Sequence, residues 1–413
     1  MIHKGKRLLI IGGGAEQISA YEIARKLGAL VVGSDQNEHA PAREFADDWI
    51  VASTRDVEET IVQARAFHKN KQIDGVVTIA NDVPLTVASV AEDLGLPGGD
   101  LAPARITANK LTQFEAFRKY GVPTPETFVA TTPDDVRQFV ERHGFPIIIK
   151  PVDNRGARGV QRYTDSFDVD WAFDHARSNS QSGTVLVQKF INGYQVSSEG
   201  MVIDGRACIP MHSGRNYEYL DRFAPYVIEN GGWLPGHISQ DAWLDLDNCM
   251  QKAAEALGLK EGPIKGDLVL GPEGPIVLEI ASRLGGGFAS THSIPATHGV
   301  DLAELVIRQA LGEKIDPAAL AIRRIGAAAI RFFLPQPGIV ERIDGYDDLD
   351  ALDWVLLKQM YVGAGDRIGD VTDHTKRAGC VIALGADIAE AEANVEIALK
   401  TVNITTRPDI GRD

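Results

Sequence analysis

The pattern of apolar and polar positions changes along the chain, and its first part predicts a parallel sheet. Short apolar runs alternate there with amphipathic segments, an order typical of βαβ units. Strands are expected near 8–11, 30–34, 49–51 and 76–79, and helices near 18–27, 57–67 and 84–94. Residues 1–108 are therefore predicted to form an open parallel-sheet α/β domain.

Beyond this part, the order of the apolar segments changes. A helix, a proline-bounded link, a second helix and a strand that ends at Lys150 follow one another. A polar joint at 313–317, which contains a proline, then precedes a last group of strands and one helix. The fold class predicted for the chain is multidomain α/β and α+β. Its later parts are a middle block over 109–315, with a lid at about 121–191, and a small C-terminal α+β domain over 316–413.

Two acidic residues lie on predicted neighbouring strands ahead of a run of glycines. The apolar runs predict a hairpin with strands at 266–271 and 275–280, joined by a three-residue loop at 272–274. This register sets Asp267 directly opposite Glu279. Because like charges on paired strands repel, a bound divalent cation is the expected compensation. A solvated acidic hairpin is the alternative that this segment leaves open.

Strict alternation assigns each residue of this hairpin to one of two faces. The acidic pair is expected on the face away from the core. The predicted core face holds Leu268, Leu270, Ile276, Leu278 and Ile280, and the other face holds Asp267, Val269, Val277 and Glu279.

Residues that suit an anion lie directly after the hairpin. Arg283 is followed by Gly285, Gly286 and Gly287. Glycine lets backbone amides approach an anion closely. A metal, an arginine and a glycine-rich turn together indicate phosphate chemistry.

Two lysines add to this indication. Lys150 closes an apolar strand and precedes the loop 153–159, which contains two glycines and two arginines. Such a loop suits a flexible cover over a polyphosphate, and a plain surface turn is the alternative. Lys110 begins a helix after Asn109, where a cation opposes the helix dipole unless an anion lies between them. A solvated surface lysine is the alternative for Lys110.

Two further segments bear on nucleotide binding. Residues 185–191 predict a strand whose main chain, beside an apolar wall, suits an adenine ring, with a plain core strand as the alternative. The first βα turn, at 12–17, lacks the third glycine of the dinucleotide fingerprint. Nicotinamide binding, as in a dehydrogenase, is therefore the weaker hypothesis.

Composition limits the classes of partner. The chain has 413 residues and a formal net charge of -15. Without a compensating basic block, this charge argues against nonspecific binding to nucleic acid or to an anionic membrane. No apolar run in the sequence approaches the roughly 20 residues of a membrane helix. Three scattered cysteines, Cys208, Cys249 and Cys380, match no metal spacing and favour a cytoplasmic protein.

Together these features resemble the ATP-grasp superfamily, and within it the branch of carboxylate-amine and L-amino-acid ligases. Residues 215–226 and 229–232 look like the insert of that branch. The resemblance covers almost the whole chain and implies a pre-ATP-grasp domain, a two-part nucleotide clamp and a C-terminal domain. It also implies ATP and Mg²⁺ or Mn²⁺ as cofactors, small carboxylate and amine substrates, and dimerisation, which is common in such families.

The resemblance implies a role for individual residues. Contacts to ATP fall on Lys110, Lys150, Arg155, Gly156, Gly159, Gln188, Lys189, Phe190, Ile191, Gln195 and Glu199. The metal ligands are Asp267 and Glu279, the catalytic candidates are Arg283, Gly286 and His292, and the substrate contacts are Arg215, Arg222, Gly285 and Gly287. The chain departs from the family pattern at Gln195, where a ribose-binding glutamate is usual, and at Ala281, where an asparagine often adds a metal ligand.

The implied reaction joins a carboxylate to an amine. The carboxylate attacks the γ-phosphate of ATP, and an amine captures the resulting acyl phosphate to give an amide or peptide bond, ADP and phosphate. One alternative is a carboxyphosphate-forming carboxylase or purine-biosynthesis ligase of the same superfamily. Another is a nucleotide-binding regulatory protein that has lost turnover, which Gln195 and Ala281 motivate.

Overall fold

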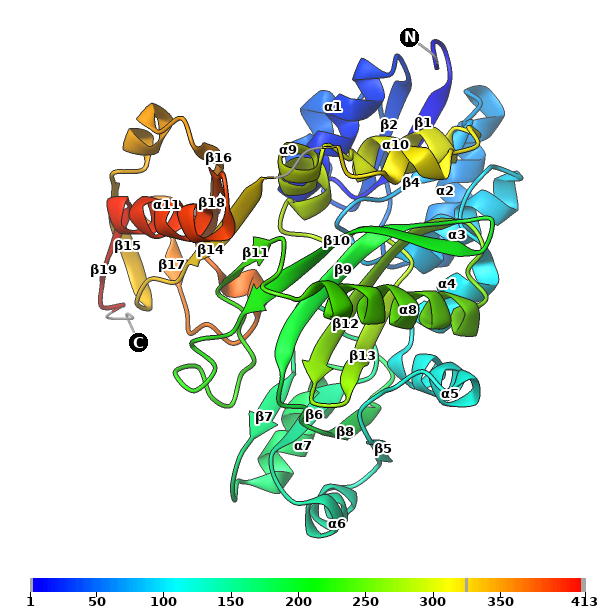
Figure 1. Ribbon diagram of the computed structural model, residues 1–413. Coiled ribbons are helices and arrows are strands. Elements are labelled where there is room, and N and C mark those ends of the chain that lie inside the picture. Colours follow the sequence, from blue (N-terminus) through cyan, green and yellow to red (C-terminus); the bar gives the residue numbers. More distant parts are fainter. Residues whose placement is uncertain (1–2, 324–325, 410–413) are drawn as a thin grey trace.

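The N-terminal segment folds as the parallel sheet that the sequence predicts. In the computed structural model, which describes residues 3–323 and 326–409, its strands lie in the order β3-β2-β1-β4 (Figure 1). Helices cover both faces of this sheet, so β1 is buried almost throughout. The elements are β1 (Arg7–Ile11), α1 (Ile18–Lys26), β2 (Leu30–Asp35), β3 (Asp48–Val51), α2 (Val57–Asn70), β4 (Gly75–Val77) and α3 (Pro84–Leu94).

A helix from much later in the chain completes the cover of this sheet. The helix α10 (Leu302–Ala310) contributes Leu302 and Ile307 to the same core as Leu8 and Tyr21. All four side chains are fully buried. The middle part of the chain is therefore packed firmly onto the N-terminal sheet, and Figure 1 shows α10 lying across it.

The predicted lid region contains a small antiparallel sheet with the strand order β5-β8-β6-β7. Two helices pack on it, and Ile147, Ile149, Val185 and Val187 form its core with Phe139. It lies at the bottom of the view in Figure 1. The elements are β5 (Thr127–Ala130), α6 (Pro133–His143), β6 (Ile147–Pro151), β7 (Gln161–Tyr163), α7 (Val169–Ser178) and β8 (Val185–Lys189).

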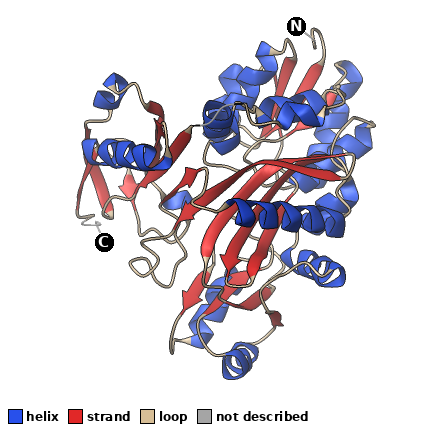
Figure 2. Cartoon of the chain, in the orientation of Figure 1, coloured by secondary structure: helices blue, strands red, loops and turns tan. Residues whose placement is uncertain are grey.

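A long sheet, with the order β13-β12-β9-β10-β11-β14-β18-β16, runs through the centre of the molecule (Figure 2). The helix α8 (Gln240–Leu257) covers one face of it, where Leu246 and Met250 pack against Leu268 and Ile280. The strands are β9 (Tyr194–Ile203), β10 (Arg206–Asn216), β11 (Gly231–Leu234), β12 (Gly262–Gly271), β13 (Gly274–Ala281), β14 (Ala327–Phe333), β16 (Val355–Met360) and β18 (Gly379–Gly385).

The central sheet does not stop where the C-terminal domain was predicted to begin. Strand β11 pairs with β14, with Trp233 opposite Ala329, so backbone hydrogen bonds join the two parts. The C-terminal part adds α11 (Ile388–Thr401) and a second small sheet. Its strands are β15 (Gly338–Asp344), β17 (Arg367–Ile368) and β19 (Asn403–Arg407). Earlier parts of the chain also contain the helices α4 (Leu101–Thr107), α5 (Lys110–Tyr120) and α9 (Ile294–His298).

The hairpin of β12 and β13 has the predicted acidic pair but an additional irregularity. Asp267 lies opposite Glu279, whereas Leu268 lies opposite Val277, so Leu278 is the extra residue of a β-bulge. Val277 is consequently turned into the core, and Leu278 lines the open face with Glu279. The prediction of strict alternation was therefore wrong for Val277 and Leu278. It was also wrong for Ile276, which pairs with the cleft-lining Val269 and so shares its face. The connecting loop is also shorter than predicted, because Gly274 already pairs with Gly271.

No helix within residues 3–323 and 326–409 combines the length and the apolar character needed to cross a bilayer.

Candidate active site

A large cleft separates the lid sheet from the open face of the central sheet. Its volume is about 880 Å³, and it is lined by residues from the N-terminal, middle and C-terminal parts of the chain. Along β9, Gln195, Ser197 and Glu199 face the cleft, whereas Val196 is buried on the α8 side. Alternation along the strand thus places polar side chains on one face and apolar ones on the other.

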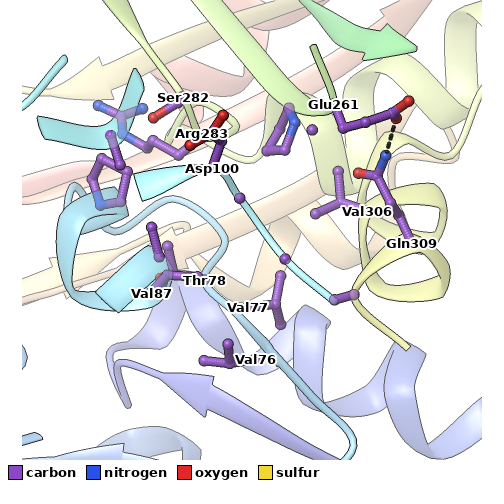
Figure 3. A pocket seen from close by; sticks show the side chains of 18 of the residues that line it. Val76, Val77, Thr78, Val87, Asp100, Glu261, Ser282, Arg283, Val306 and Gln309 are labelled. Carbon is purple, nitrogen blue, oxygen red and sulfur yellow. Dashed lines mark hydrogen bonds between the residues drawn. The ribbon is translucent and has the colours of Figure 1, made fainter. Parts of the chain in front are cut away.

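A second pocket is too small to compete with this cleft. It has a volume of about 60 Å³ and lies between the N-terminal sheet and α10 (Figure 3). Its walls include Val76, Val77 and Val306, and a hydrogen bond of 3.0 Å joins Gln309 to Glu261 at its edge. Such a volume holds a few water molecules, so the large cleft is the candidate site.

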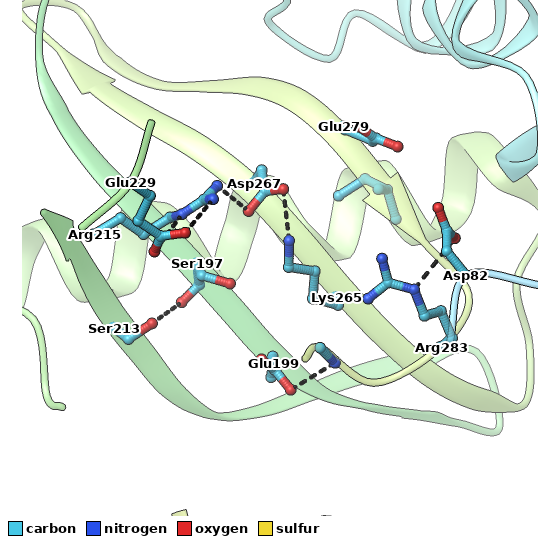
Figure 4. Close-up of polar contacts among 12 residues, drawn as sticks. Asp82, Ser197, Glu199, Ser213, Arg215, Glu229, Lys265, Asp267, Glu279 and Arg283 are labelled. Atoms are coloured by element: carbon cyan, nitrogen blue, oxygen red, sulfur yellow. Dashed lines mark hydrogen bonds and ion pairs between the residues drawn. The ribbon is translucent and has the colours of Figure 1, made fainter. Parts of the chain in front are cut away.

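The two facing carboxylates are held by different cations. Arg215 donates to Asp267 over 2.8 Å, and Lys265 pairs with the same carboxylate (Figure 4). Burial would raise the pKa of Asp267, but the charges of Arg215 and Lys265 outweigh it and hold the pKa well below its usual range. Glu279 pairs instead with Lys110 over 3.1 Å. Both carboxylates line the cleft and are thus available to a cation brought in by a ligand.

The two predicted lysines lie beside this acidic pair and are largely buried. Lys150 is the next-to-last residue of β6, and its ammonium group lies 5.4 Å from the centre of the Phe114 ring. Burial, and then the nearby charge of Lys110, lower the pKa of Lys150 to about 7. Lys110 donates to the carbonyl of Asn154 over 2.9 Å. Two buried cations this close together favour an anion between them.

The loop 153–159 lies along one side of the cleft and is held at its first residue and in its middle. The Asp153 carboxylate accepts hydrogen bonds from Ser180 and Ser182, both at 2.8 Å. In the middle of the loop, the carbonyl of Gly156 accepts the amide of His374 at 3.0 Å. The backbone φ angles of 64° at Gly156, 60° at Ala157 and 73° at Gly159 give the loop its tight curvature. Arg155, Gly156 and Gly159 thus form one cover that touches the C-terminal part.

The predicted adenine-binding segment follows β8 at the edge of the lid. Gln188 is buried and donates to Thr127 over 2.6 Å, and the amide of Phe190 is bound to Pro146 at 3.0 Å. Gln188, Lys189, Phe190, Ile191 and Gln195 all line the cleft. Glu199 lies on the same strand as Gln195 but four residues further along, about 13 Å away at the rise of a strand. The structure therefore separates Glu199 from the predicted ribose position.

Two carboxylates already accept hydrogen bonds from the backbone amides of the glycine turn. The amide of Gly285 donates to Glu199 and that of Gly287 donates to Glu16, both over 3.0 Å. A Cβ atom at position 285 would lie 2.2 Å from the Glu199 carboxylate, and one at Gly286 would lie 2.8 Å from that of Glu16. Burial raises the pKa of both carboxyl groups. Glycine is thus required at positions 285 and 286, because the carboxylates of Glu199 and Glu16 lie too close for a Cβ atom. The sequence analysis had not indicated this.

Arg283 is positioned by an acidic residue of the N-terminal domain. Its Nε donates to Asp82 over 3.2 Å (Figure 4). Arg155 lies 3.7 Å from the same carboxylate. Burial would raise the pKa of Asp82, but Arg283 and then Arg155 outweigh it and hold the pKa at about 2. Sequence reasoning missed Asp82, although it follows β4 at the carboxyl edge of the parallel sheet, where α/β folds place ligands.

Arg215, Arg222 and His292 do not have the surroundings expected of substrate-binding or catalytic residues. Arg215 lines the cleft, but Glu229 and Asp267 both bind its guanidinium, so no free bidentate face is left for a substrate carboxylate. Arg222 is exposed and stacks on Tyr219 at 5.3 Å, and the described lining of the cleft does not include it. His292 is likewise outside that lining and contacts Thr291 over 2.9 Å.

The C-terminal part contributes residues to the cleft that the sequence analysis did not single out. His374 is partly buried, and its desolvation lowers its pKa well below the usual value, which keeps the ring neutral. Its Nε2 accepts the amide of Glu229 at 3.3 Å. Arg377 also bonds to Glu229 and lines the same end of the cleft. Both lie in a loop between strands, and only the folding of the chain brings them to the cleft.

Comparisons with known proteins agree with this architecture. Family models match the chain in sequence: the ATP-grasp N-terminal domain over 21–98, the ATP-binding domain of the carbamoyl-phosphate synthase L chain over 109–318, and the L-amino acid ligase C-terminal domain 2 over 331–407. The second of these models alone spans half of the chain.

Individual relatives are more distant in sequence. The chain is 26% identical to the protein y4rH of Sinorhizobium fredii over 360 residues, covering 86% of this chain and 73% of that protein. It is 25% identical to phosphoribosylamine–glycine ligase of Pyrococcus furiosus over 321 residues, covering 73% and 72% of the two chains.

The fold is similar to a solved structure. L-amino acid ligase from Bacillus licheniformis superposes with a TM-score of 0.84 at 22% identity, over 97% of this chain and 99% of that one. At this identity the likeness shows a shared fold. Together with the matched ATP-binding domain and the two flanking domain models, it establishes that the chain belongs to the ATP-grasp family of ligases.

Proposed function

We propose that the protein is an ATP-dependent ligase that activates a carboxylate as an acyl phosphate and joins it to an amine. One observation carries the proposal: the carboxylates of Asp267 and Glu279 and the ammonium groups of Lys110 and Lys150 line one cleft. Carboxylates suit a divalent cation and lysines suit phosphate, so nucleotide phosphates fit between them. The C-terminal domain of L-amino acid ligase type supports an amino acid as one substrate.

The residues present fit Mg²⁺ or Mn²⁺ that arrives with a nucleotide. Within the described residues, no group of three or more His, Cys, Asp or Glu side chains is arranged to hold a metal alone. Mg²⁺ at nucleotide sites usually takes one or two carboxylates and completes its shell with phosphate oxygens and water. Asp267 and Glu279 supply that number of carboxylates. When bound, the ion would neutralise charge on the phosphates.

The other residues have separate tasks in the proposed reaction. Lys110 and Lys150 place positive charge where the phosphoryl oxygens gain negative charge. The cover loop, held through Gly156 and His374, keeps water away from the acyl phosphate. Arg283 is fixed by Asp82 and suits an anionic oxygen of the acyl phosphate. The substrate carboxylate is itself the nucleophile, so the reaction needs no nucleophilic side chain.

Trapping with hydroxylamine tests the proposal without knowledge of the natural amine. The protein is incubated with Mg²⁺, ATP, hydroxylamine and single carboxylic acids, with amino acids foremost, while ADP and hydroxamate are measured. We expect at least one acid to give hydroxamate and ADP in equal amounts. Tight ATP binding with no hydroxamate from any acid would instead favour a regulatory role.

Variants of the hairpin link the activity to the acidic pair. Asp267→Asn and Glu279→Gln should each lower hydroxamate formation by about a hundredfold or more, because charge on the metal-bound phosphates loses compensation. Glu273→Gln is the matched control, since Glu273 lies exposed at the tip of the same hairpin. Equal activity in all three variants would contradict the proposed metal site.

A further inference from the structure

The residues at one end of the cleft take no part in the proposed phosphate chemistry. There the N-terminal domain, the glycine turn and the C-terminal domain meet. Glu16, Gly286, Phe332, Tyr361 and Arg377 all line this end. Two of its side chains carry opposite charges, and the remaining ones supply an aromatic wall. We call these five residues the three-domain subsite.

Glu16 is presented to the subsite by a rigid loop. It lies in the short helix Ala15–Gln17 directly after β1, where the next residue, Gln17, accepts the amide of Ile79 over 3.1 Å. Tyr21 fixes the same loop by donating to the carbonyl of Gly12 over 2.9 Å. The Glu16 carboxylate then reaches across the domain boundary to Gly287. The loop therefore holds a carboxylate over the turn, where an anionic group of a ligand would be repelled.

Arg377 supplies the opposite charge with an unused donor. Its side chain is only 10% exposed and lies flat on Phe332, with 3.6 Å between the guanidinium carbon and the ring centre. Its Nη2 bonds to Glu229 at 3.4 Å. Its Nε, by contrast, is buried and has no hydrogen-bond partner within residues 3–323 and 326–409. A buried donor without a partner is costly, so a ligand oxygen is the natural complement.

The two charges suit the two ends of a zwitterion. We propose, resting on the ligase function above, that the three-domain subsite binds the amine substrate as an α-amino acid. Glu16 accepts hydrogen bonds from its ammonium group, and Arg377 donates to its carboxylate. Phe332 and Tyr361 form the wall beside its side chain. An amine that carries a phosphate is disfavoured, because its two negative charges would lie against Glu16.

The position of the subsite agrees with this assignment. Glu16 contacts the glycine turn that directly follows Arg283, the residue proposed to face the acyl phosphate. Burial raises the pKa of Glu16 overall, and the amide of Gly287 and the charges of Arg377 and Arg283 oppose this rise only in part. The amine held by Glu16 thus lies next to the place where its nitrogen reacts once it has given up a proton. Glu16 and Arg377 act here as specificity-determining residues.

The test compares L-amino acids with their C-terminal amides as acceptors, using the carboxylic acid identified by hydroxylamine trapping. The amides keep the amine but lose the negative charge. The readout is the rate of amide-bond formation divided by the rate of hydroxamate formation, which corrects for any loss of folded enzyme. Wild type should use the amino acids at least tenfold better than their amides in kcat/KM.

The variants give a pattern that a structural role would not produce. Arg377→Gln should abolish the preference for amino acids over amides, and Arg377→Lys should restore part of it. Glu16→Gln should lower the ratio about tenfold or more for both kinds of acceptor, because both carry the ammonium group. Arg342→Gln, whose side chain is exposed and pairs with Asp344, is the matched control and should keep the wild-type ratio.

Two failures can be told apart. If wild type forms no hydroxamate with any acid, the ligase function itself is refuted. If hydroxamate forms but wild type uses amides as well as amino acids, or if Glu16→Gln and Arg377→Gln behave like Arg342→Gln, the subsite is refuted and the ligase function stands.

Discussion

The carboxylate of Glu199 lies directly against Gly285 and accepts its amide over 3.0 Å. A Cβ atom at that glycine would come within 2.2 Å of the Glu199 Oε1 atom. The glycine identity at this position is thus set by an acid on another strand, and the turn after Arg283 depends on their close approach.

Replacement of this glycine tests the contact. Gly285→Ala should destabilise the protein by about 1–3 kcal/mol, because the added methyl group forces Glu199 or the turn to move. Thermal melting measures the loss. Gly99→Ala is the control, since a Cβ atom there meets nothing within 4 Å. Equal melting temperatures for the two variants would contradict the tight packing of Glu199 on the turn.

Nucleotide binding should depend on pH through Lys150, whose pKa is lowered to about 7 by burial and by Lys110. Phosphates bind the charged ammonium form. Above pH 7 the charged fraction of the free protein falls about tenfold per pH unit, so the Kd for a non-hydrolysable ATP analogue should rise by up to that factor. Calorimetric titration between pH 6.5 and 8.5 measures this change.

An arginine at the same position provides the comparison for this pH dependence. Lys150→Arg stays charged over the whole range, so its Kd should be nearly independent of pH. A Kd of the wild-type protein that does not change between pH 7 and 8.5 would show that Lys150 is already protonated without nucleotide.

The metal requirement should respond to Glu279. Removal of divalent ions with EDTA should abolish ADP formation, and Mg²⁺ or Mn²⁺ should restore it. Glu279→Gln should raise the Mg²⁺ concentration for half-maximal rate about tenfold or more, because one charged ligand is lost. Glu273→Gln, at the exposed tip of the same hairpin, should titrate like wild type. Full activity in EDTA would overturn the assignment.

The contact between the cover loop and the C-terminal part should control water access. Asp373 is buried and accepts the amide of Thr375 over 2.8 Å, which shapes the turn that presents the His374 amide to Gly156. Asp373→Ala should speed hydrogen exchange in the cover loop and raise the amount of ADP formed per amide bond, because water reaches the acyl phosphate.

A nearby acid serves as the control for this variant. Asp370 is exposed and lies three residues earlier in the chain. Asp370→Ala should leave both hydrogen exchange and the ADP-to-amide ratio unchanged. If Asp373→Ala does the same, the loop does not depend on this turn.

Several features of the fold could be read from local patterns. The parallel sheet at the N-terminus follows from the spacing of its apolar runs. Asp267 is paired with Glu279 as predicted, but only because the shorter loop and the bulge offset one another. The bulge at Leu278 could not be predicted, because an extra residue in one strand leaves no mark in the alternation of apolar types. It reversed the faces of Ile276, Val277 and Leu278.

The sequence by itself determined the elements whose stability is local: strands and helices with their apolar faces, the acidic hairpin, and the lysine near the end of β6. Only the tertiary structure decided which charges meet in the cleft. Glu16, Asp82 and Arg377 come from segments far apart in the chain. The guanidinium of Arg215 is bound by Glu229 and Asp267, so it has no free face for a substrate. Burial and ion pairing depend on distances in space, and these are set by the packing of all three parts of the chain.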